Sequence, residues 1–253
     1  MRWGIGMVVT LSLLVAACGG SAPVPTSTPT PAKTSSPIVG TVTYWSLGRS
    51  PGAQVLELVK RPDGYLVAWN GGRPHPPLAL HGHALVLSRS HTVDTGNGST
   101  VSLPGVELIP EGATLILVTH VTGQGAAQRD TLVPLTRHAY LAALASYREE
   151  MVREWTDLLS GALQTWAGEH GNYPPPDALQ PDTPFGQLVA RQMLSGLPQQ
   201  MKKTQPAWPI NPYTTEPMHS GTQPGDFTYR LQGEGYVLAG HLGNGRDYTV
   251  RSP

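Results

Sequence analysis

Residues 136–179 read TRHAYLAALASYREEMVREWTDLLSGALQTWAGEHGNYPPPDAL and predict one long helix that ends in a turn. Apolar side chains recur there at steps of three and four: Tyr140, Leu144, Tyr147, Met151, Trp155, Leu158, Leu159, Ala162, Leu163 and Trp166. This spacing is typical of an amphipathic helix with one buried stripe. Thr136 can cap the first amides and Gly171 can end the helix. We therefore expect a helix from about 137 to 170, roughly 50 Å long.

Short alternating segments precede this helix. Residues 38–135 hold seven or eight apolar runs separated by turn signals, among them Asn70-Gly71-Gly72, His81-Gly82, Gly96-Asn97-Gly98 and Gly123-Gln124-Gly125. Runs of this length and spacing predict a small antiparallel β domain, either a barrel or a sandwich. The first part of the helix, 137–148, should lean on this domain.

A shorter helix and a small sheet are expected after the long helix. Thr183-Pro184 opens the second helix, Gly196 closes it, and its apolar side begins with Phe185. Strands follow at 225–231, 235–242 and 247–250, and this sheet should cover residues 151–170 of the long helix. The expected fold class is α+β: an N-terminal antiparallel β barrel or sandwich, then a long helix packed on a C-terminal antiparallel sheet.

The amino terminus has the layout of an export signal. Met1-Arg2 gives a positive start, 5–15 is apolar, and Val15-Ala16-Ala17-Cys18 supplies small residues for cleavage between Ala17 and Cys18. Cys18 is the only cysteine of the chain. These four residues resemble the lipobox of bacterial lipoproteins, which implies a lipid on Cys18; the alternative is an ordinary signal peptide with a chance cysteine. The resemblance implies an exported protein anchored to the bacterial cell membrane, facing outward into the periplasm or the extracellular space.

The remaining boundaries follow from composition. Residues 19–37 are rich in Pro, Ser and Thr, which is typical of a tether that buries no core. We expect a signal peptide at 1–17, a lipidated tether at 18–37, the β domain at 38–135 and an α+β domain at 136–253. Basic and acidic residues are equal in number and only 13% of residues are charged. This balance gives no electrostatic reason to expect a nucleic-acid partner.

Three groups of segments follow one another in the second half of the chain: Ala162-Leu163-Gln164-Thr165-Trp166-Ala167 with His170-Gly171-Asn172-Tyr173-Pro174, then Trp208-Pro209-Ile210-Asn211-Pro212-Tyr213-Thr214 with Pro217-Met218, then Gly225-Asp226-Phe227-Thr228-Tyr229 leading to Gly235-Tyr236-Val237-Leu238. In their order and spacing these segments resemble the soluble head of type IV pilins and of type II secretion pseudopilins. The resemblance covers roughly 151–250. It implies a pilin-like head that acts in protein contact, as an accessory to a secretion or pilus system.

This chain departs from that family at its membrane attachment. Pilin-like proteins carry an apolar N-terminal helix that crosses the membrane and forms the filament core. The long helix here begins after residue 135 and is charged on one face, so it is not expected to span a bilayer. Polymerisation through a helical core is therefore not expected.

Several residues could belong to a metal site or a catalytic site. His81 and His83, flanked by His75 and His91, have a spacing that can ligate zinc, but no third ligand is fixed and solvated turn histidines are favoured. Val93-Asp94-Thr95-Gly96 matches the triplet of aspartic proteases, whose chemistry needs two such carboxylates. We expect no enzyme activity, no metal and no cofactor.

Two further groups lie in the C-terminal half. Asp226, with Asn211, Thr214, Glu216 and Ser220, offers the oxygen ligands that calcium prefers, although turn capping is the favoured role. The aromatic residues Trp166, Tyr173, Trp208 and Tyr213 are expected in the core and packed loops; an exposed cluster would favour sugar binding.

Three functional hypotheses follow. The first is a non-enzymatic, lipid-anchored envelope lipoprotein that contacts an unidentified protein partner. The second is a carrier of a small apolar ligand, and it requires a cavity lined by Trp45, Leu56, Leu85 and Leu117. The third is an aspartic-type hydrolase in which two copies of Asp94 meet in a dimer.

Overall fold

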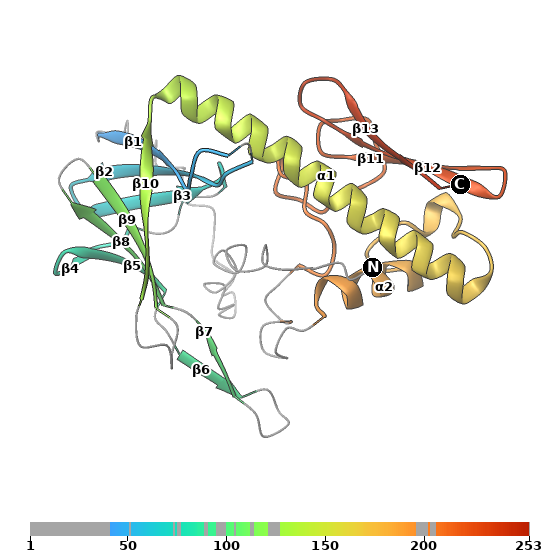
Figure 1. The fold of residues 1–253 in the computed structure, drawn as a ribbon, viewed down its shortest axis with the longest axis horizontal. Coiled ribbons are helices and arrows are strands. Elements are labelled where there is room, and N and C mark those ends of the chain that lie inside the picture. The colour runs from blue at the N-terminus through green and yellow to red at the C-terminus, as the bar shows by residue number, and fades with distance from the viewer. Residues whose placement is uncertain are drawn as a thin grey trace, which may run out of the picture.

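An eight-stranded antiparallel sheet is the largest sheet among the described residues (Figure 1). This computed structural model describes residues 41–50, 52–72, 74, 77–88, 91–94, 100–103, 105–111, 114–120, 127–195, 202 and 206–252. The sheet contains β1 (Val42–Ser46), β2 (Val55–Arg61), β3 (Gly64–Trp69), β4 (Leu80–His81), β5 (Ala84–Ser88), β8 (Gly105–Glu111), β9 (Thr114–His120) and β10 (Gln128–Leu135). The strands β6 (His91–Asp94) and β7 (Thr100–Leu103) form a separate ribbon.

The eight-stranded sheet curls until its two edges nearly meet. Its order is β3-β2-β1-β10-β9-β8-β5-β4, so β3 and β4 are the edge strands. Tyr65 of β3 exchanges two backbone hydrogen bonds with Leu78, two residues before β4, at 2.8 and 2.9 Å. These bonds bring the two edges together and give the sheet a nearly closed, barrel-like form.

The helix α1 (Arg137–His170) has the predicted bounds, and both predicted caps are confirmed. The Thr136 hydroxyl accepts a hydrogen bond from the Ala139 amide at 3.2 Å. Gly171 ends the helix in the left-handed conformation, with φ of 77°, and its amide donates to the Ala167 carbonyl. Among the described residues, no helix is long and apolar enough to cross a membrane.

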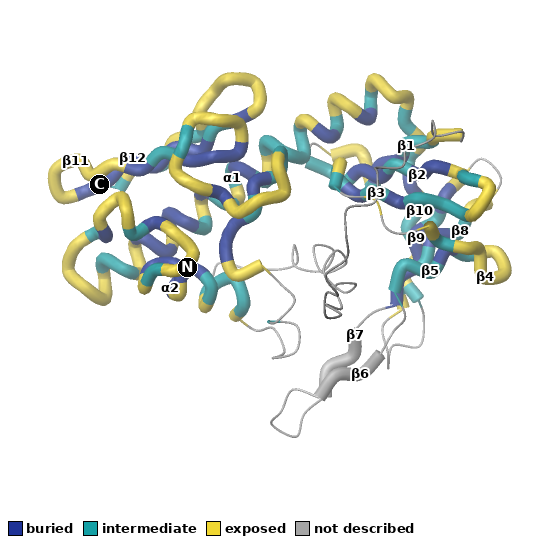
Figure 2. Tube along the Cα trace, turned by 180° about the vertical axis from the view of Figure 1, so that it is seen from behind, coloured by how far each residue is buried: buried dark blue, intermediate teal, exposed yellow. Residues whose placement is uncertain are grey.

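Each half of α1 packs against a different part of the protein, as the sequence predicts. Tyr140 and Leu144 join Val55 of β2 in one cluster, so the first half of α1 lies on the barrel-like sheet. Leu159 and Leu163, from the second half, belong to the C-terminal core (Figure 2). The helix therefore takes part in the packing of both bodies.

The C-terminal body contains a three-stranded sheet and two short helices around the second half of α1. The sheet is β11 (Phe227–Gln232), β12 (Gly235–His241) and β13 (Asp247–Arg251), with β12 in the centre. The helix α2 (Pro184–Met193) packs on α1, opposite the sheet in Figure 1, and the 3₁₀ helix η2 (Pro176–Ala178) contacts both α2 and β11. In α2, Thr183 accepts from the Gly186 amide at 3.0 Å, and Phe185 is fully buried.

The predicted α+β fold class is wrong, because strands dominate the described chain. Eight short segments each pair antiparallel with a neighbour, so they merge into one sheet of eight strands. The long helix is one element laid across this sheet and the three-stranded sheet, rather than the framework of the fold. The prediction of a barrel or sandwich fits in part, since the sheet is barrel-like.

The buried face of α1 differs from the predicted apolar stripe. Thr156 and Ser160 are buried, whereas Trp155 and Trp166 are only partly buried. The Thr156 hydroxyl donates to the Val152 carbonyl at 2.7 Å, and Ser160 bonds the Tyr236 hydroxyl at 2.7 Å. These bonds satisfy the polar groups inside the core, so small hydroxyl residues can replace apolar ones there.

Candidate functional site

The two residues predicted for lipid attachment and cleavage, Cys18 and Ala17, lie outside the described residues. Asp94 ends β6, where its backbone pairs with Thr100 of β7. The structure does not describe the Asp94 side chain and therefore does not test the hydrolase hypothesis. The roles assigned to Cys18, Ala17 and Asp94 therefore remain predictions.

The histidines predicted as weak metal candidates do not form a described site. His81 ends β4 and His83 lies in the turn after it, and both are exposed. No group of three or more His, Cys, Asp or Glu residues that could hold a metal occurs in the described part of the chain. Exposed turn histidines, as favoured by the sequence, fit these positions.

Asp226 and Asn211 are buried together at the start of the C-terminal sheet. Asn211 donates to the Asp226 carboxylate at 3.2 Å and accepts from the amides of Tyr213 and Thr214 at 2.8 and 3.3 Å. The amide of Gln223 donates to the other Asp226 oxygen at 3.3 Å. These bonds hold two loops together, so turn capping, the favoured reading, accounts for the cluster.

The four aromatic residues considered as a sugar platform are engaged in packing. Trp208 is buried and donates to the Met218 carbonyl at 2.7 Å. Tyr173 contacts the Tyr236 ring edge to face, and Trp166 stacks on His170 with ring centroids 3.9 Å apart. Tyr213 lies under an arginine, as described below. They do not form one exposed aromatic surface.

The interior of the barrel-like sheet is filled by side chains. Trp45, Leu56, Leu85 and Leu117 are all buried and belong to one hydrophobic cluster. The cavity that the carrier hypothesis requires would have to lie between these residues, where they pack against one another. The described core therefore counts against a ligand carried inside the sheet.

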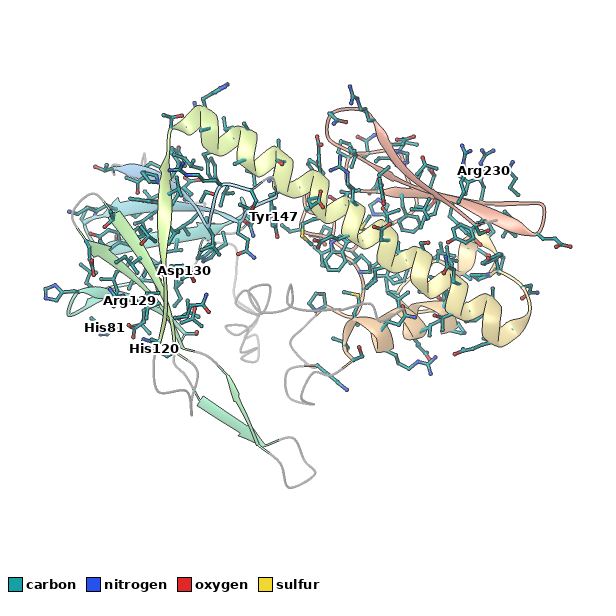
Figure 3. The ribbon with its side chains drawn as sticks, in the orientation of Figure 1. His81, His120, Arg129, Asp130, Tyr147 and Arg230 are labelled. Atoms are coloured by element: carbon teal, nitrogen blue, oxygen red, sulfur yellow. The ribbon has the colours of Figure 1, made fainter. Side chains whose placement is uncertain are left out.

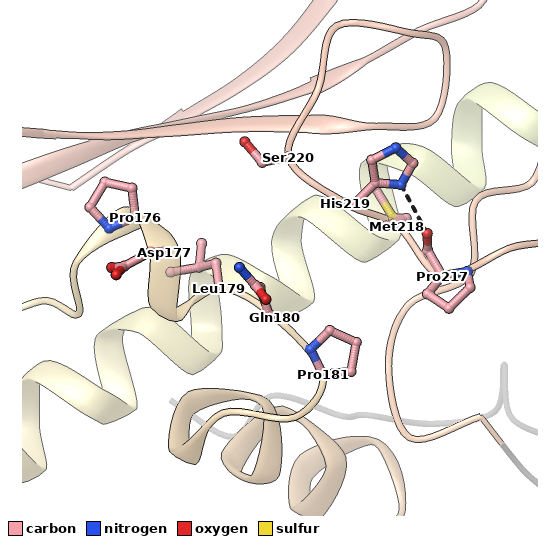
Figure 4. Close-up of a pocket in the computed structure, with 9 residues that line it drawn as sticks. All are labelled: Pro176, Asp177, Leu179, Gln180, Pro181, Pro217, Met218, His219 and Ser220. Carbon is pink, nitrogen blue, oxygen red and sulfur yellow. Dashed lines mark hydrogen bonds between the residues drawn. The ribbon is translucent and has the colours of Figure 1, made fainter.

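One cavity, of about 440 Å³, lies between η2 and the loop before β11 (Figure 4). Asp177, His219 and Ser220 are the polar side chains that could serve chemistry there. The His219 Nδ1 lies 3.3 Å from the Pro217 carbonyl, and its Nε2 lies 3.6 Å from Asp226. Both ring nitrogens of His219 thus lie near other protein groups, a carbonyl and a carboxylate.

A second cavity, of about 260 Å³, lies between α1 and two loops of the C-terminal body. We call it the helix groove. Its α1 wall consists of Leu141, Leu144, Ala145, Arg148 and Glu149, and its loop wall of Tyr213, Gly243 and Asn244. Leu141 is 49% exposed, although Leu144, one turn further on, is buried. The helix groove therefore combines an open apolar rim with a charged end.

Arg148, on α1, lies close to residues of both the barrel-like sheet and the C-terminal body. Its guanidinium carbon lies 5.4 Å from the centre of the Tyr213 ring, a cation–π distance. A side chain placed at Gly71, in the turn after β3, would meet an Arg148 nitrogen at 2.9 Å. The Arg148 side chain thus reaches from the turn of the barrel-like sheet to the Tyr213 loop.

The charge of Arg148 is not balanced within the described residues. Arg148 takes part in none of their ion pairs, and its Nε is buried without a hydrogen-bond partner. The neighbouring Glu149 points to Arg153, at 3.8 Å. A half-buried guanidinium without a carboxylate is costly unless an anion joins it.

The tyrosines beside the helix groove are held neutral. Burial, more than any charge, raises the pKa of Tyr213, and its hydroxyl accepts a hydrogen bond from the Gly243 amide at 2.9 Å. Burial likewise raises the pKa of Tyr147, and nearby Glu154 adds to the rise (Figure 3). Among the described residues that line the groove, Arg148 is the one cationic side chain and Glu149 the one anionic side chain.

Comparisons of the chain with protein-family models, with curated proteins and with solved structures found no match. The helix groove must therefore be judged from its own residues. The sequence did not single out Arg148, because a charged residue of an amphipathic helix is expected on the side that faces solvent. Its position after Tyr147 in the apolar stripe was the only signal of a partly buried cation.

Proposed function

We propose that this protein is an exported lipoprotein, anchored through Cys18 to the outward face of the bacterial cell membrane, that works by binding another protein. The observation that carries the proposal is the sequence Val15-Ala16-Ala17-Cys18 after an apolar run, with the only cysteine at the cleavage position. Residues 19–37 would then tether the folded bodies to the membrane.

Two further observations support protein contact over catalysis. The buried polar pair Asn211 and Asp226 serves turns and holds two loops together. The helix groove presents an apolar rim beside an unbalanced cation, which suits recognition of a polypeptide. The order of segments in 151–250 that resembles pilins and pseudopilins supports a role as an accessory to a secretion or pilus system.

A membrane fractionation experiment tests the anchor. The chain and its Cys18→Ser variant are expressed in a bacterium with and without an inhibitor of the lipoprotein signal peptidase. The unchanged chain should sediment with membranes and grow in apparent mass when the inhibitor is present. The Cys18→Ser variant should show no change of mass with the inhibitor, and a mass of the unchanged chain that is equally insensitive would contradict the proposal.

A further inference from the structure

The helix groove has an unbalanced positive charge next to an apolar surface. Arg148 has no ion pair among the described residues, and its Nε is buried without a partner. The outer nitrogens of the guanidinium are not fully buried and make no hydrogen bond among the described residues, and Arg148 lines the groove. A guanidinium is suited to pair with a carboxylate through two parallel hydrogen bonds.

The other polar groups of the helix groove each make a hydrogen bond or an ion pair within the protein. The Tyr213 hydroxyl accepts from the Gly243 amide, and the Asn244 side chain accepts from the Arg246 amide at 3.0 Å. Glu149, on the same wall of the groove, lies 3.8 Å from Arg153. Arg148 lines the groove without an ion pair among the described residues, so its charge favours an anionic ligand.

The exposed apolar rim of the groove indicates which kind of group adjoins the anion in the ligand. Leu141 is 49% exposed and lies on the same face of α1 as Ala145 and Arg148, at steps of four and three. An apolar side chain placed here would cover Leu141 and Ala145 while its carboxylate pairs with Arg148. A volume of about 260 Å³ admits one such residue.

We propose that the helix groove binds the carboxylate of a partner polypeptide together with an adjoining apolar side chain, with Arg148 as the anion-binding residue. This inference deepens the proposed role in protein contact and rests on it. The cation–π contact with the Tyr213 ring, at 5.4 Å, restricts the Arg148 side chain before the partner arrives. Holding the side chain in advance lowers the entropy lost on binding.

The test uses small probes on the full chain in detergent micelles. N-acetyl-leucine carries both a carboxylate and an apolar side chain, whereas N-acetyl-leucinamide lacks only the charge. In ¹⁵N NMR titrations, N-acetyl-leucine should shift the Arg148 Nε–Hε signal and the Gly243 and Ala145 amides, and saturate. The amide probe should bind at least tenfold more weakly, and inorganic phosphate, which lacks the apolar part, should also be at least tenfold weaker.

Two variants complete the test. Arg148→Gln should abolish the saturable shifts at Gly243 and Ala145, whereas Arg230→Gln should retain them, because Arg230 lies on β11 (Figure 3). Equal binding of the acid and amide probes, equal binding of phosphate, or shifts that map elsewhere would overturn the inference. The comparison of the acid, amide and phosphate probes on the unchanged chain tests the inference even if Arg148→Gln does not fold. The readout does not depend on the lipid, so failure here is distinct from failure of the anchor.

Discussion

The Ser160–Tyr236 hydrogen bond is the clearest residue-scale contribution to the C-terminal core. The two hydroxyls are 2.7 Å apart, and Tyr236 is 1% exposed. Ser160→Ala leaves the phenol with only a long bond to the Ser160 carbonyl, at 3.4 Å. We expect a loss of about 1–3 kcal/mol in the free energy of unfolding.

Urea denaturation measures this loss, with Thr165→Ala as the control. Thr165 is exposed, and its hydroxyl donates to the Gly161 carbonyl on the surface of the same helix. The control should change stability by less than about 0.5 kcal/mol. Equal losses in the two variants would show that the Ser160–Tyr236 bond does not stabilise the core.

Tyr229 makes stability depend on pH in the alkaline range. Burial, and to a lesser degree Tyr236 and Tyr173, raises the pKa of Tyr229, whose hydroxyl donates to the Pro174 carbonyl at 2.9 Å. The folded protein therefore holds the proton more tightly than the unfolded chain. The stability is full below the ordinary tyrosine pKa of about 10 and is lost as the pH rises above it.

Stability measured at several pH values tests this linkage. Between about pH 10 and pH 12, the free energy of unfolding of the unchanged protein should fall more steeply than that of Tyr229→Phe. The slopes are compared rather than the absolute values, because the substitution also removes the bond to Pro174. Parallel slopes would mean that Tyr229 titrates normally.

At the element scale, Gly240 sets how closely β12 approaches α1. A side chain at Gly240 would collide with the Thr156 hydroxyl and would lie 2.8 Å from a Val152 methyl group. Gly240→Ala must push the strand from the helix, and we expect a loss of at least about 2 kcal/mol. Gly161→Ala is the matched control, since a side chain there meets nothing within 4 Å.

Thermal unfolding gives the comparison. Gly161→Ala should raise stability, by about 0.5–1 kcal/mol, because alanine favours a helix interior over glycine. A gain, or no change, for Gly240→Ala would contradict the close contact between α1 and β12.

The elements with strong local signals were predictable from the sequence. The bounds of α1 follow from the cap at Thr136 and the stop at Gly171, and both are local features. The eight-stranded sheet depends on pairings between distant segments, such as β1 with β10, which no local pattern encodes. For the same reason the burial of Thr156 and the position of Arg148 against Tyr213 could not be predicted.

For the whole molecule, α1 is the element that joins the two bodies. Its first half buries Tyr140 and Leu144 against the barrel-like sheet, and its second half buries Leu159 and Leu163 in the C-terminal core. The helix groove lies between the first half of α1 and two loops of the C-terminal body. In the proposed function, both bodies lie outside the cell membrane and are anchored through a single lipid on Cys18.

Intact mass analysis of the amino-terminal peptide of the mature protein, purified from bacterial membranes, tests that claim most directly. The account predicts a chain that begins at Cys18 and carries the added mass of a thioether-linked diacylglycerol. A mature chain that begins at another residue, or that begins at an unmodified Cys18, would contradict it.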